Sequence, residues 1–222
     1  MLCSEDVAEL LDSFPPVEFA FAYGSGVVEQ GGYKYEQAVP SNMPMLDVIL
    51  VVEDSEKWHA ENLRMNGADY TPILPLGSKY IAKFQEEISA NLWFNAYVPM
   101  KSTKFSGRLM KYGVISKKHL MKDLTDWNRF YTAGRLQKPV HILKSNEAIQ
   151  AAIQTNLESA VRTSLLLMPD EFEETDLYLA IASLSYVGDP RMYFGENPRK
   201  VIPLHSLFLL LLQNLPFYLF VI

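Results

Sequence analysis

The chain has 222 residues, of which 49% are hydrophobic and 21% are charged. This composition excludes a largely disordered chain, since it supplies enough apolar surface for a sizeable core. The single cysteine, Cys3, excludes an internal disulfide framework and a cysteine-cluster zinc site. A formal net charge of −6 argues against a nucleic-acid binder that depends on bulk positive charge, so we expect no nucleic-acid partner.

The two ends of the chain differ in character. The N-terminus is acidic and the first arginine is Arg64, so no secretory signal and no arginine-rich presequence is visible. This fits a cytosolic protein, an internal address or an incomplete N-terminus. No Asp, Glu, Lys or Arg follows Lys200, and residues 203–222 form an apolar tail. Because Pro203 and Pro216 interrupt it, the pattern favours a buried helix or an atypical end over a membrane anchor.

The first half of the chain begins with one helical and two extended patterns. Apolar residues recur with helical spacing over residues 7–14, and two prolines end that helix. Residues 17–23 form a short apolar and aromatic run that is typical of a strand. Residues 45–52 are almost continuously apolar, which predicts a central strand that is buried on both faces.

Polar and glycine-containing segments separate these elements from the next group. Residues 30–42 have the composition of a loop. Asp54 or Ser55 is suited to cap the N-terminus of a helix that contains Trp58. We further expect a helix at residues 79–88 and a pair of strands at 92–98 and 108–116, with the turn region at 101–107.

The character of the sequence changes near residue 117, where helical patterns take over. Helices are expected at residues 119–131, 146–167 and 176–186. We therefore predict an α/β domain over residues 1–116, a mostly helical domain over residues 117–202, and the atypical apolar tail at residues 203–222.

The sequence Gly24-Ser25-Gly26 directly follows the strand predicted at residues 17–23. Glycine lets the backbone approach a phosphate closely, and a helix beginning at Ser25 or Gly26 would direct free N–H groups at an anion. The segment lacks the Lys-Ser/Thr of a P-loop and the spacing of a dinucleotide fingerprint. Taken alone, it favours a tight turn over a phosphate site.

Asp47 lies inside the most apolar strand of the sequence. An ionised carboxylate in a buried strand is costly unless it is paired or binds a metal. Strand alternation places Asp47 on one face with Ile49 and Val51. We expect Asp47 near the start of the strand, where it either forms a structural hydrogen bond or serves a metal or substrate.

A strand, a Gly-Ser turn and a second strand with an acid together outline a DNA polymerase β-like nucleotidyltransferase. In that superfamily the turn holds the triphosphate, and acids on the next strand hold the Mg²⁺ ions that neutralise it. The usual Asp-x-Asp pair is incomplete here, because Ile49 stands two residues after Asp47. A second metal ligand has to come from elsewhere, and the candidates are Glu53, Asp54 and Asp189.

Several blocks of sequence match a known family in the same order. They lie within residues 20–27, 46–49, 58–63, 107–115, 127–140 and 184–192. In these blocks the chain resembles the mitochondrial CDP-diacylglycerol synthase family, also described as mitochondrial phosphatidate cytidylyltransferases or translocator assembly and maintenance proteins. The resemblance covers roughly residues 17 to 200, and several such blocks in order are very unlikely to agree by chance.

This resemblance implies a fold, a reaction and a location. The fold would be an α/β DNA polymerase β-like nucleotidyltransferase domain followed by a mostly helical domain, for example of winged-helix type. The reaction converts CTP and phosphatidic acid into CDP-diacylglycerol and pyrophosphate for cardiolipin biosynthesis, with Mg²⁺ as the cofactor. The enzyme would be a peripheral protein on the matrix side of the mitochondrial inner membrane.

The resemblance also implies roles for individual residues. Asp47 and Lys111 are the candidate catalytic residues, and Asp47 is a metal ligand, with Asp54 or Asp189 as a further one. Lys138 is either an anion contact or a solvated surface charge. The candidate nucleotide-binding residues are Tyr23, Gly24, Ser25, Gly26 and Arg135.

Two other hypotheses stay open. The missing second acid and the uncharged tail also fit a catalytically impaired isoform that acts as a membrane-associated assembly factor. The other hypothesis is a nucleotidyltransferase with a different acceptor, such as a protein or an RNA end, although the acidic charge balance disfavours RNA. A second acid close to Asp47 and the Gly-Ser-Gly turn would favour the enzyme over the assembly factor.

Overall fold

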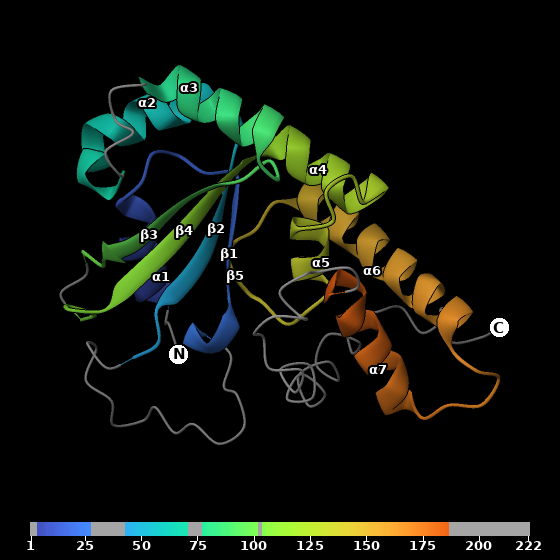
Figure 1. Cartoon of the computed structure of the whole chain (residues 1–222). Coiled ribbons are helices and arrows are strands. Elements are labelled where there is room, and N and C mark those ends of the chain that lie inside the picture. The colour runs from blue at the N-terminus through green and yellow to red at the C-terminus, as the bar shows by residue number, and fades with distance from the viewer. Residues whose placement is uncertain (1–3, 28–42, 71–76, 102–103, 187–222) are drawn as a thin grey trace. The chain divides into compact units, whose positions relative to one another are not determined.

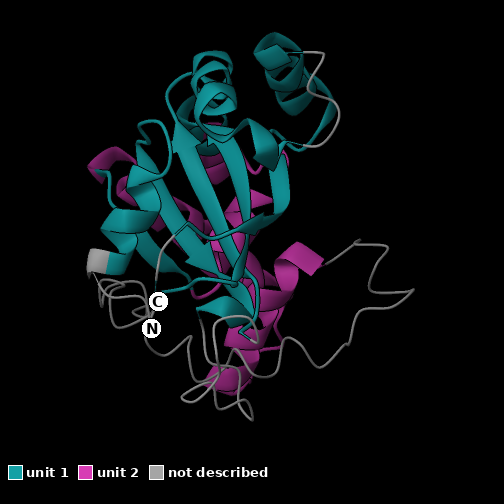
Figure 2. Cartoon of the chain, turned by 90° about the vertical axis from the view of Figure 1, so that its left-hand side faces the viewer, with its two compact units in different colours: residues 1–121, 140–146 teal, residues 122–139, 147–222 magenta. Residues whose placement is uncertain are grey.

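The computed structural model describes residues 4–27, 43–70, 77–101 and 104–186 of the chain. The chain divides into two compact units, which Figure 2 shows in different colours. Unit 1 contains residues 1–121 and 140–146, and unit 2 contains residues 122–139 and 147–222. Unit 1 holds the sheet, so the α/β class predicted from the sequence is confirmed.

A five-stranded mixed sheet forms the centre of unit 1, with its strands in the order β3-β4-β2-β1-β5 (Figure 1). β2 and β4 are parallel, and the other neighbouring strands are antiparallel. The central position of β2 explains its continuous apolar sequence, because both of its faces are covered. The strands are β1 (Phe19–Tyr23), β2 (Leu46–Val52), β3 (Trp93–Pro99), β4 (Leu109–Ser116) and β5 (His141–Lys144).

The described helices are distributed over both units. α3 continues into a short π-helical segment at Phe84–Ile88, and α4 begins in unit 1 and ends in unit 2. The helices are α1 (Ser4–Asp12), α2 (Ser55–Asn66), α3 (Gly77–Lys83), α4 (Lys117–Asp126), α5 (Thr132–Leu136), α6 (Glu147–Leu167) and α7 (Glu174–Ser183).

One face of the sheet packs against α1 and α2 (Figure 1). Leu10 of α1 and Trp58 of α2 share a buried cluster with alternate residues of β2 and β4. The Trp58 indole also donates a hydrogen bond to the carbonyl oxygen of Pro15, at 3.2 Å. Because side chains alternate along a strand, the residues between these ones, Asp47 included, belong to the opposite face. The strand residues of the cluster include Leu46, Val48, Leu50, Val52, Met110, Tyr112 and Val114.

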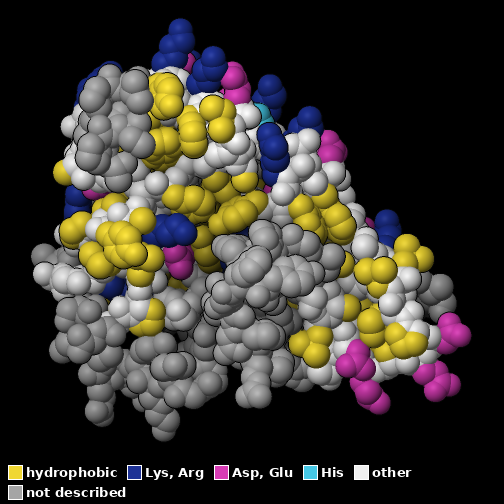
Figure 3. Space-filling view, viewed as in Figure 1, with side chains coloured by type: hydrophobic (Ala, Val, Ile, Leu, Met, Phe, Trp, Pro, Cys, Tyr) yellow, Lys and Arg dark blue, Asp and Glu magenta, His cyan; other side chains and the backbone are white. Residues whose placement is uncertain are grey.

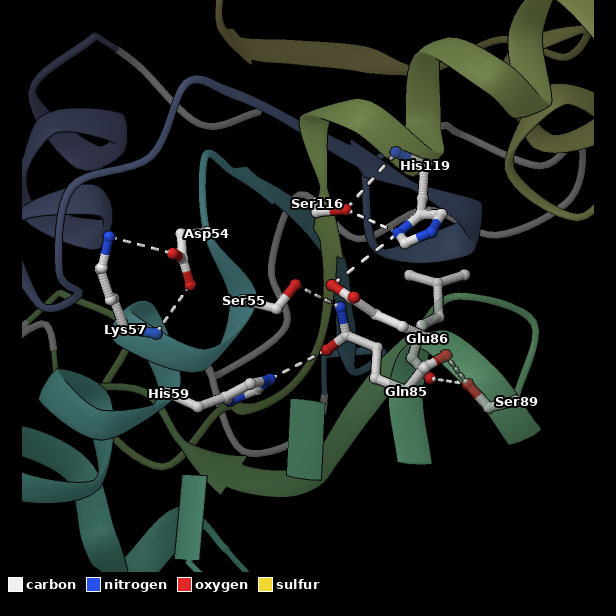
Figure 4. Close-up of polar contacts among 10 residues, drawn as sticks. Asp54, Ser55, Lys57, His59, Gln85, Glu86, Ser89, Ser116 and His119 are labelled. Carbon is white, nitrogen blue, oxygen red and sulfur yellow. Dashed lines mark hydrogen bonds and ion pairs between the residues drawn. The ribbon is translucent and has the colours of Figure 1, made fainter. Parts of the chain in front are cut away.

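A buried polar network joins α2 to the π-helical segment, and Figure 4 shows part of it. The ring nitrogens of His59 lie 2.8 Å from the Tyr70 hydroxyl and 2.9 Å from the amide oxygen of Gln85. The Gln85 amide in turn donates to the Ser55 hydroxyl. Burial lowers the pKa of His59 to about 4, so the ring is neutral at ordinary pH. His59 is therefore a hydrogen-bonded structural histidine.

Unit 2 has a core of its own, formed between α6 and α7. Ala160 and Val161 of α6 lie in one buried cluster with Leu177 and Ile181 of α7. The first turn of α7 is closed by a capping box, in which Glu173 and Asp176 exchange side-chain and backbone hydrogen bonds.

Three features differ from the expectations drawn from the sequence. The helix expected at residues 119–131 ends at Asp126, because Trp127 and Phe130 adopt positive φ angles that an α-helix does not allow. The short elements α5 and β5 were not expected, and β5 returns residues 140–146 to the sheet of unit 1.

The apolar tail at residues 203–222 lies outside the described residues. Among the described helices, none combines the length and hydrophobicity that a membrane crossing requires.

Candidate active site

The Gly24-Ser25-Gly26 sequence forms a single 3₁₀ turn at the end of β1, and the description of this segment ends at Val27. Gly24 has a φ of +75°, a conformation that residues with a Cβ rarely adopt. A Cβ on Gly26 would lie 2.7 Å from the carbonyl oxygen of Met45, so this glycine lets the turn pack against the residues before β2. The backbone therefore requires both glycines at these positions.

Asp47 lies at the start of β2, beside this turn. In the register of the sheet it lies directly opposite Tyr23 on β1 and Lys111 on β4, so the three residues form a row across neighbouring strands. The carboxylate oxygen Oδ2 of Asp47 is 3.5 Å from the position that a Cβ on Gly24 would occupy. The expected position of Asp47 is thus confirmed. We call this group the Tyr23–Asp47–Lys111 row.

Lys111 is held over an aromatic ring of the neighbouring strand. Its Nζ lies 4.3 Å from the centroid of the Phe94 ring, which is a cation–π distance. A Cβ on Gly113 would lie only 2.5 Å from this ring and 2.7 Å from Ile49, so Gly113 provides the space that Phe94 occupies. Figure 3 shows a basic side chain next to an acidic one within the hydrophobic surface over these strands.

Arg108 is a residue of this region that the sequence reasoning missed. It closes a tight turn, in which its N–H donates to Phe105 O at 2.9 Å and Gly107 has a φ of +87°. Its side chain is only 5% exposed, and it donates to Gly26 O at 2.8 Å and to Pro44 O at 3.0 Å. Burial lowers the pKa of its guanidinium from the ordinary value. The one available signal was its place in the block at residues 107–115 that matches the family.

Asp54 is not brought to Asp47 by the fold. It follows the other end of β2, and a strand rise of about 3.3 Å per residue separates the two carboxylates by roughly 20 Å. Asp54 instead caps α2, accepting from Lys57 N at 3.0 Å and pairing with the Lys57 ammonium (Figure 4). These interactions, led by the backbone hydrogen bond, lower the pKa of Asp54. Asp189 lies outside the described residues.

The residues around Asp47 can be tested against the requirements of Mg²⁺. Within the part of the chain that the structure describes, no group of three or more His, Cys, Asp or Glu could hold a metal ion. Mg²⁺ does not need such a cage, since it is usually held by one or two carboxylates, by water and by substrate phosphates. Asp47 beside a turn suited to phosphates therefore fits an ion that arrives with a nucleotide.

The other predicted cations, Arg135 and Lys138, belong to unit 2. Arg135 lies in α5 and is half-buried. Lys138 is 3% exposed, so its interpretation as a solvated surface charge is wrong. Its ammonium donates to Gly134 O and to the Ser185 hydroxyl, and it lies 4.3 Å from the centroid of the Tyr186 ring. Burial, with Arg135 nearby, lowers the pKa of Lys138 to about 7.

A cavity of about 590 Å³ opens beyond the other end of β2. Both acidic and basic side chains line it, and they include Glu86 and His119 (Figure 4). The His119 ring lies 2.8 Å from the Ser116 hydroxyl, which also accepts from His119 N at 3.4 Å, as at a helix start. The Ser116–His119 contacts are capping interactions, and the cavity lining includes neither Asp47 nor Lys111. We therefore place the candidate active site at the Tyr23–Asp47–Lys111 row.

The fold and this row define an α/β protein with a candidate site for a phosphorylated ligand at one end of its three central strands. Comparison with known proteins is more specific. The sequence profile of the family described as "Phosphatidate cytidylyltransferase, mitochondrial" matches residues 7–207. The chain belongs to this family.

Individual relatives agree with the family match, and each carries the name phosphatidate cytidylyltransferase, mitochondrial. The protein of Mus musculus is 44% identical over 196 residues, which cover 87% of this chain and 56% of the relative. That of Schizosaccharomyces pombe is 41% identical over 199 residues, covering 89% and 48%. That of Homo sapiens is 42% identical over 197 residues, covering 87% and 42%. The chain thus spans about half the length of the curated relatives it matches.

Proposed function

We propose that the chain is a phosphatidate cytidylyltransferase, which makes CDP-diacylglycerol and pyrophosphate from CTP and phosphatidic acid for cardiolipin biosynthesis. The observation that carries the proposal is the Tyr23–Asp47–Lys111 row beside the Gly24–Gly26 turn, in a chain that belongs to this family. The row joins residues that are far apart in sequence and lie at one end of the three adjacent central strands. The relatives are named phosphatidate cytidylyltransferases, and this name supplies the proposed reaction.

The proposed fold is that of a DNA polymerase β-like nucleotidyltransferase. Two features support it: the glycine turn ends β1, and the acid Asp47 begins the adjacent antiparallel strand β2. A ligand on the turn would therefore contact the acid directly. For the mostly helical unit 2, a winged-helix arrangement remains part of the proposal.

The triphosphate is the part of CTP that the turn is suited to receive. Gly24 has no Cβ on the side that faces the Asp47 carboxylate, so phosphate oxygens could approach the turn closely there. Ser25 adds a hydroxyl, for which the described residues provide no hydrogen-bond partner. Tyr23 and Lys111 lie on either side of Asp47, and Lys111 places a positive charge next to the Asp47 carboxylate. Arg135 is a further proposed contact of the nucleotide, on the basis of the family resemblance alone.

The reaction needs alignment and charge screening more than proton transfer. A phosphate oxygen of phosphatidic acid attacks the α-phosphorus of CTP, a new P–O bond forms, and the bond to the β-phosphate breaks to release pyrophosphate. The attacking phosphate is already anionic near neutral pH, so a strong base is unnecessary. Mg²⁺ held by Asp47 and the phosphates would screen the repulsion between the two anions. The turn and Lys111 would hold the triphosphate in line for the attack.

The proposed location is the matrix side of the mitochondrial inner membrane, where the protein would be peripheral. The relatives are named mitochondrial, which supports the compartment. Phosphatidic acid is itself a membrane lipid, so the active site has to reach a bilayer surface.

The test is a transfer assay with the full chain, liposomes that contain phosphatidic acid, and CTP labelled at either the α- or the γ-phosphorus. We expect α-label to enter the lipid phase and γ-label to appear as pyrophosphate, both only when phosphatidic acid and Mg²⁺ are present. Transfer to another acceptor would replace the substrate assignment. A folded chain that binds CTP and transfers nothing would overturn the enzyme and favour the assembly-factor hypothesis.

A further inference from the structure

We propose that Arg108 binds the pyrophosphate part of the nucleotide and holds the Gly24–Gly26 turn in the shape that receives it. The inference rests on the proposed function only for the identity of the ligand. The geometry itself points to a site for a phosphorylated anion. The three observations that follow carry the proposal.

The first observation is that Arg108 is a buried charge for which the described residues supply no counter-charge. Its side chain is 5% exposed, yet no carboxylate of the described residues lies within ion-pair distance of it. Its polar side-chain contacts are neutral carbonyl oxygens, and the Phe105 ring lies 5.9 Å from the guanidinium carbon. Burying a charge is costly unless an opposite charge accompanies it. An anionic ligand would provide that missing partner.

The second observation is that the guanidinium lies against the turn itself. Its Nη2 donates to Gly26 O at 2.8 Å and lies 3.1 Å from the place where a Cβ on Gly26 would be. A side chain at position 26 would therefore crowd both the Arg108 guanidinium and the residues before β2. The absence of that side chain leaves the positive charge close to the backbone that is proposed to cradle the triphosphate.

The third observation is that Arg108 has hydrogen-bond donors to spare. A guanidinium carries five N–H donors in a planar fork. Within the described ranges two of the donors are used, one toward Gly26 and one toward Pro44, which lie on either side of the connection between β1 and β2. The remaining donors match the oxygens of a phosphate, with which arginine forms strong charge-assisted pairs.

If Arg108 only held the chain in place, its two contacts to carbonyl oxygens would be explained, but anion binding would not depend on its positive charge. The experiment therefore measures the affinity of the full chain for inorganic pyrophosphate and for CTP by calorimetry. It compares the wild type with Arg108→Gln, which removes the charge, and Arg108→Lys, which keeps it without the fork. The matched control is Arg64→Gln, an exposed arginine in the same unit.

We expect Arg108→Gln to weaken pyrophosphate and CTP binding by about tenfold or more, the size of one charge-assisted contact. Arg108→Lys should fall between the wild type and Arg108→Gln, and Arg64→Gln should bind like the wild type. A folded Arg108→Gln variant with unchanged affinity for pyrophosphate would overturn the proposal.

A second measurement needs no variant, so a folding defect cannot obscure the answer. Pyrophosphate should slow deuterium uptake of the wild type at residues 24–27 and 108–111, and unchanged uptake there would also overturn the proposal. The proposed function can fail while this inference holds. In that outcome the chain binds pyrophosphate through Arg108 but forms no CDP-diacylglycerol. Conversely, lipid product with an unchanged KM for CTP in Arg108→Gln would leave the function and remove this inference.

Discussion

Two buried charged side chains, Arg108 in unit 1 and Asp123 in unit 2, differ in how many hydrogen-bond partners the described residues give them. Asp123 is 2% exposed, and its carboxylate accepts four backbone N–H groups at 2.7–2.9 Å. Arg108 is 5% exposed, and among the described residues its side chain donates to two carbonyl oxygens. The donors to Asp123 are the N–H groups of Arg129, Phe130, Thr132 and Ala133.

The difference in hydrogen-bond partners distinguishes a structural charge, Asp123, from Arg108, the charge that we propose binds an anion. Asp123 organises the chain reversal after α4, where Trp127 and Phe130 have positive φ angles, and it satisfies the first N–H groups of α5. Its hydrogen bonds leave little capacity for a ligand. Arg108 has donors that no described residue uses, and it lies beside a glycine turn. Burial alone therefore does not indicate function, whereas the balance of partners does.

The largest expected effect is on stability, at Asp123. Asp123→Asn places an amide N–H group against backbone N–H donors, so we expect the free energy of unfolding to fall by about 3 kcal/mol or more. Urea unfolding followed by circular dichroism measures it. The control is Asp126→Asn, an exposed residue of the same helix, which should change stability by no more than about 0.5 kcal/mol. Equal effects of the two substitutions would contradict the structural role of Asp123.

The next effect concerns the space beneath Phe94. Gly113→Ala would place a Cβ 2.5 Å from the Phe94 ring, and overpacking of this kind costs about 1–3 kcal/mol of stability. The double variant Gly113→Ala/Phe94→Leu should recover part of the loss. Gly67→Ala is the matched control, because nothing lies within 4 Å of the added Cβ and its φ is −57°. Thermal unfolding of the four proteins tests the prediction, and a neutral Gly113→Ala would contradict it.

A smaller effect is expected from the pH dependence of unit 2. The pKa of Lys138 is lowered from 10.5 to about 7 by burial, so between these values the unfolded chain binds more protons than the folded chain. Stability contributed by this group should therefore rise with pH, by about 1 kcal/mol between pH 7.5 and 8.5. Lys138→Met should remove this rise, and Lys122→Met, at an exposed lysine, should not. Identical pH profiles of Lys138→Met and the wild type would refute the assignment.

The smallest effect concerns the orientation of Lys111. Phe94→Leu keeps an apolar side chain over Gly113 but removes the aromatic ring beneath the ammonium, which is worth about 0.5–1 kcal/mol. We expect the KM for CTP to rise about two- to fivefold. Tyr97→Leu, at a highly exposed aromatic residue of the same strand, is the control and should leave KM unchanged. An unchanged KM in Phe94→Leu would show that the ring does not position Lys111.

The sequence was informative where local pattern determines the structure. The apolar runs predicted β1 to β4, and the Gly-Ser-Gly and Asp47 motifs were correctly placed at neighbouring strand ends. It was silent on β5, a strand of four residues whose stability comes from pairing with β1 rather than from its own pattern. It also missed Arg108, because that environment is made by Gly26 and Pro44, which are 82 and 64 residues away.

Local motifs also suggested contacts that the fold does not make. Asp54 follows Asp47 by seven residues in sequence, but the extended strand between them carries it to the far end of β2. The sequence left Lys138 open between an anion contact and a solvated surface charge, and the fold encloses it between Gly134 and Ser185. Separation along a strand and burial by distant segments are properties of the folded chain, so a motif alone does not specify them.

The measurement that most directly tests the account is cytidylyl transfer to phosphatidic acid by Asp47→Asn beside the wild type. Asp54→Asn is the matched control, since Asp54 caps α2 at the other end of the same strand and Asn caps equally well. We predict a folded Asp47→Asn protein with a rate of CDP-diacylglycerol formation about a hundredfold or more below the wild type, and near-normal activity in Asp54→Asn. A folded Asp47→Asn variant with a rate close to that of the wild type would contradict the proposed active site.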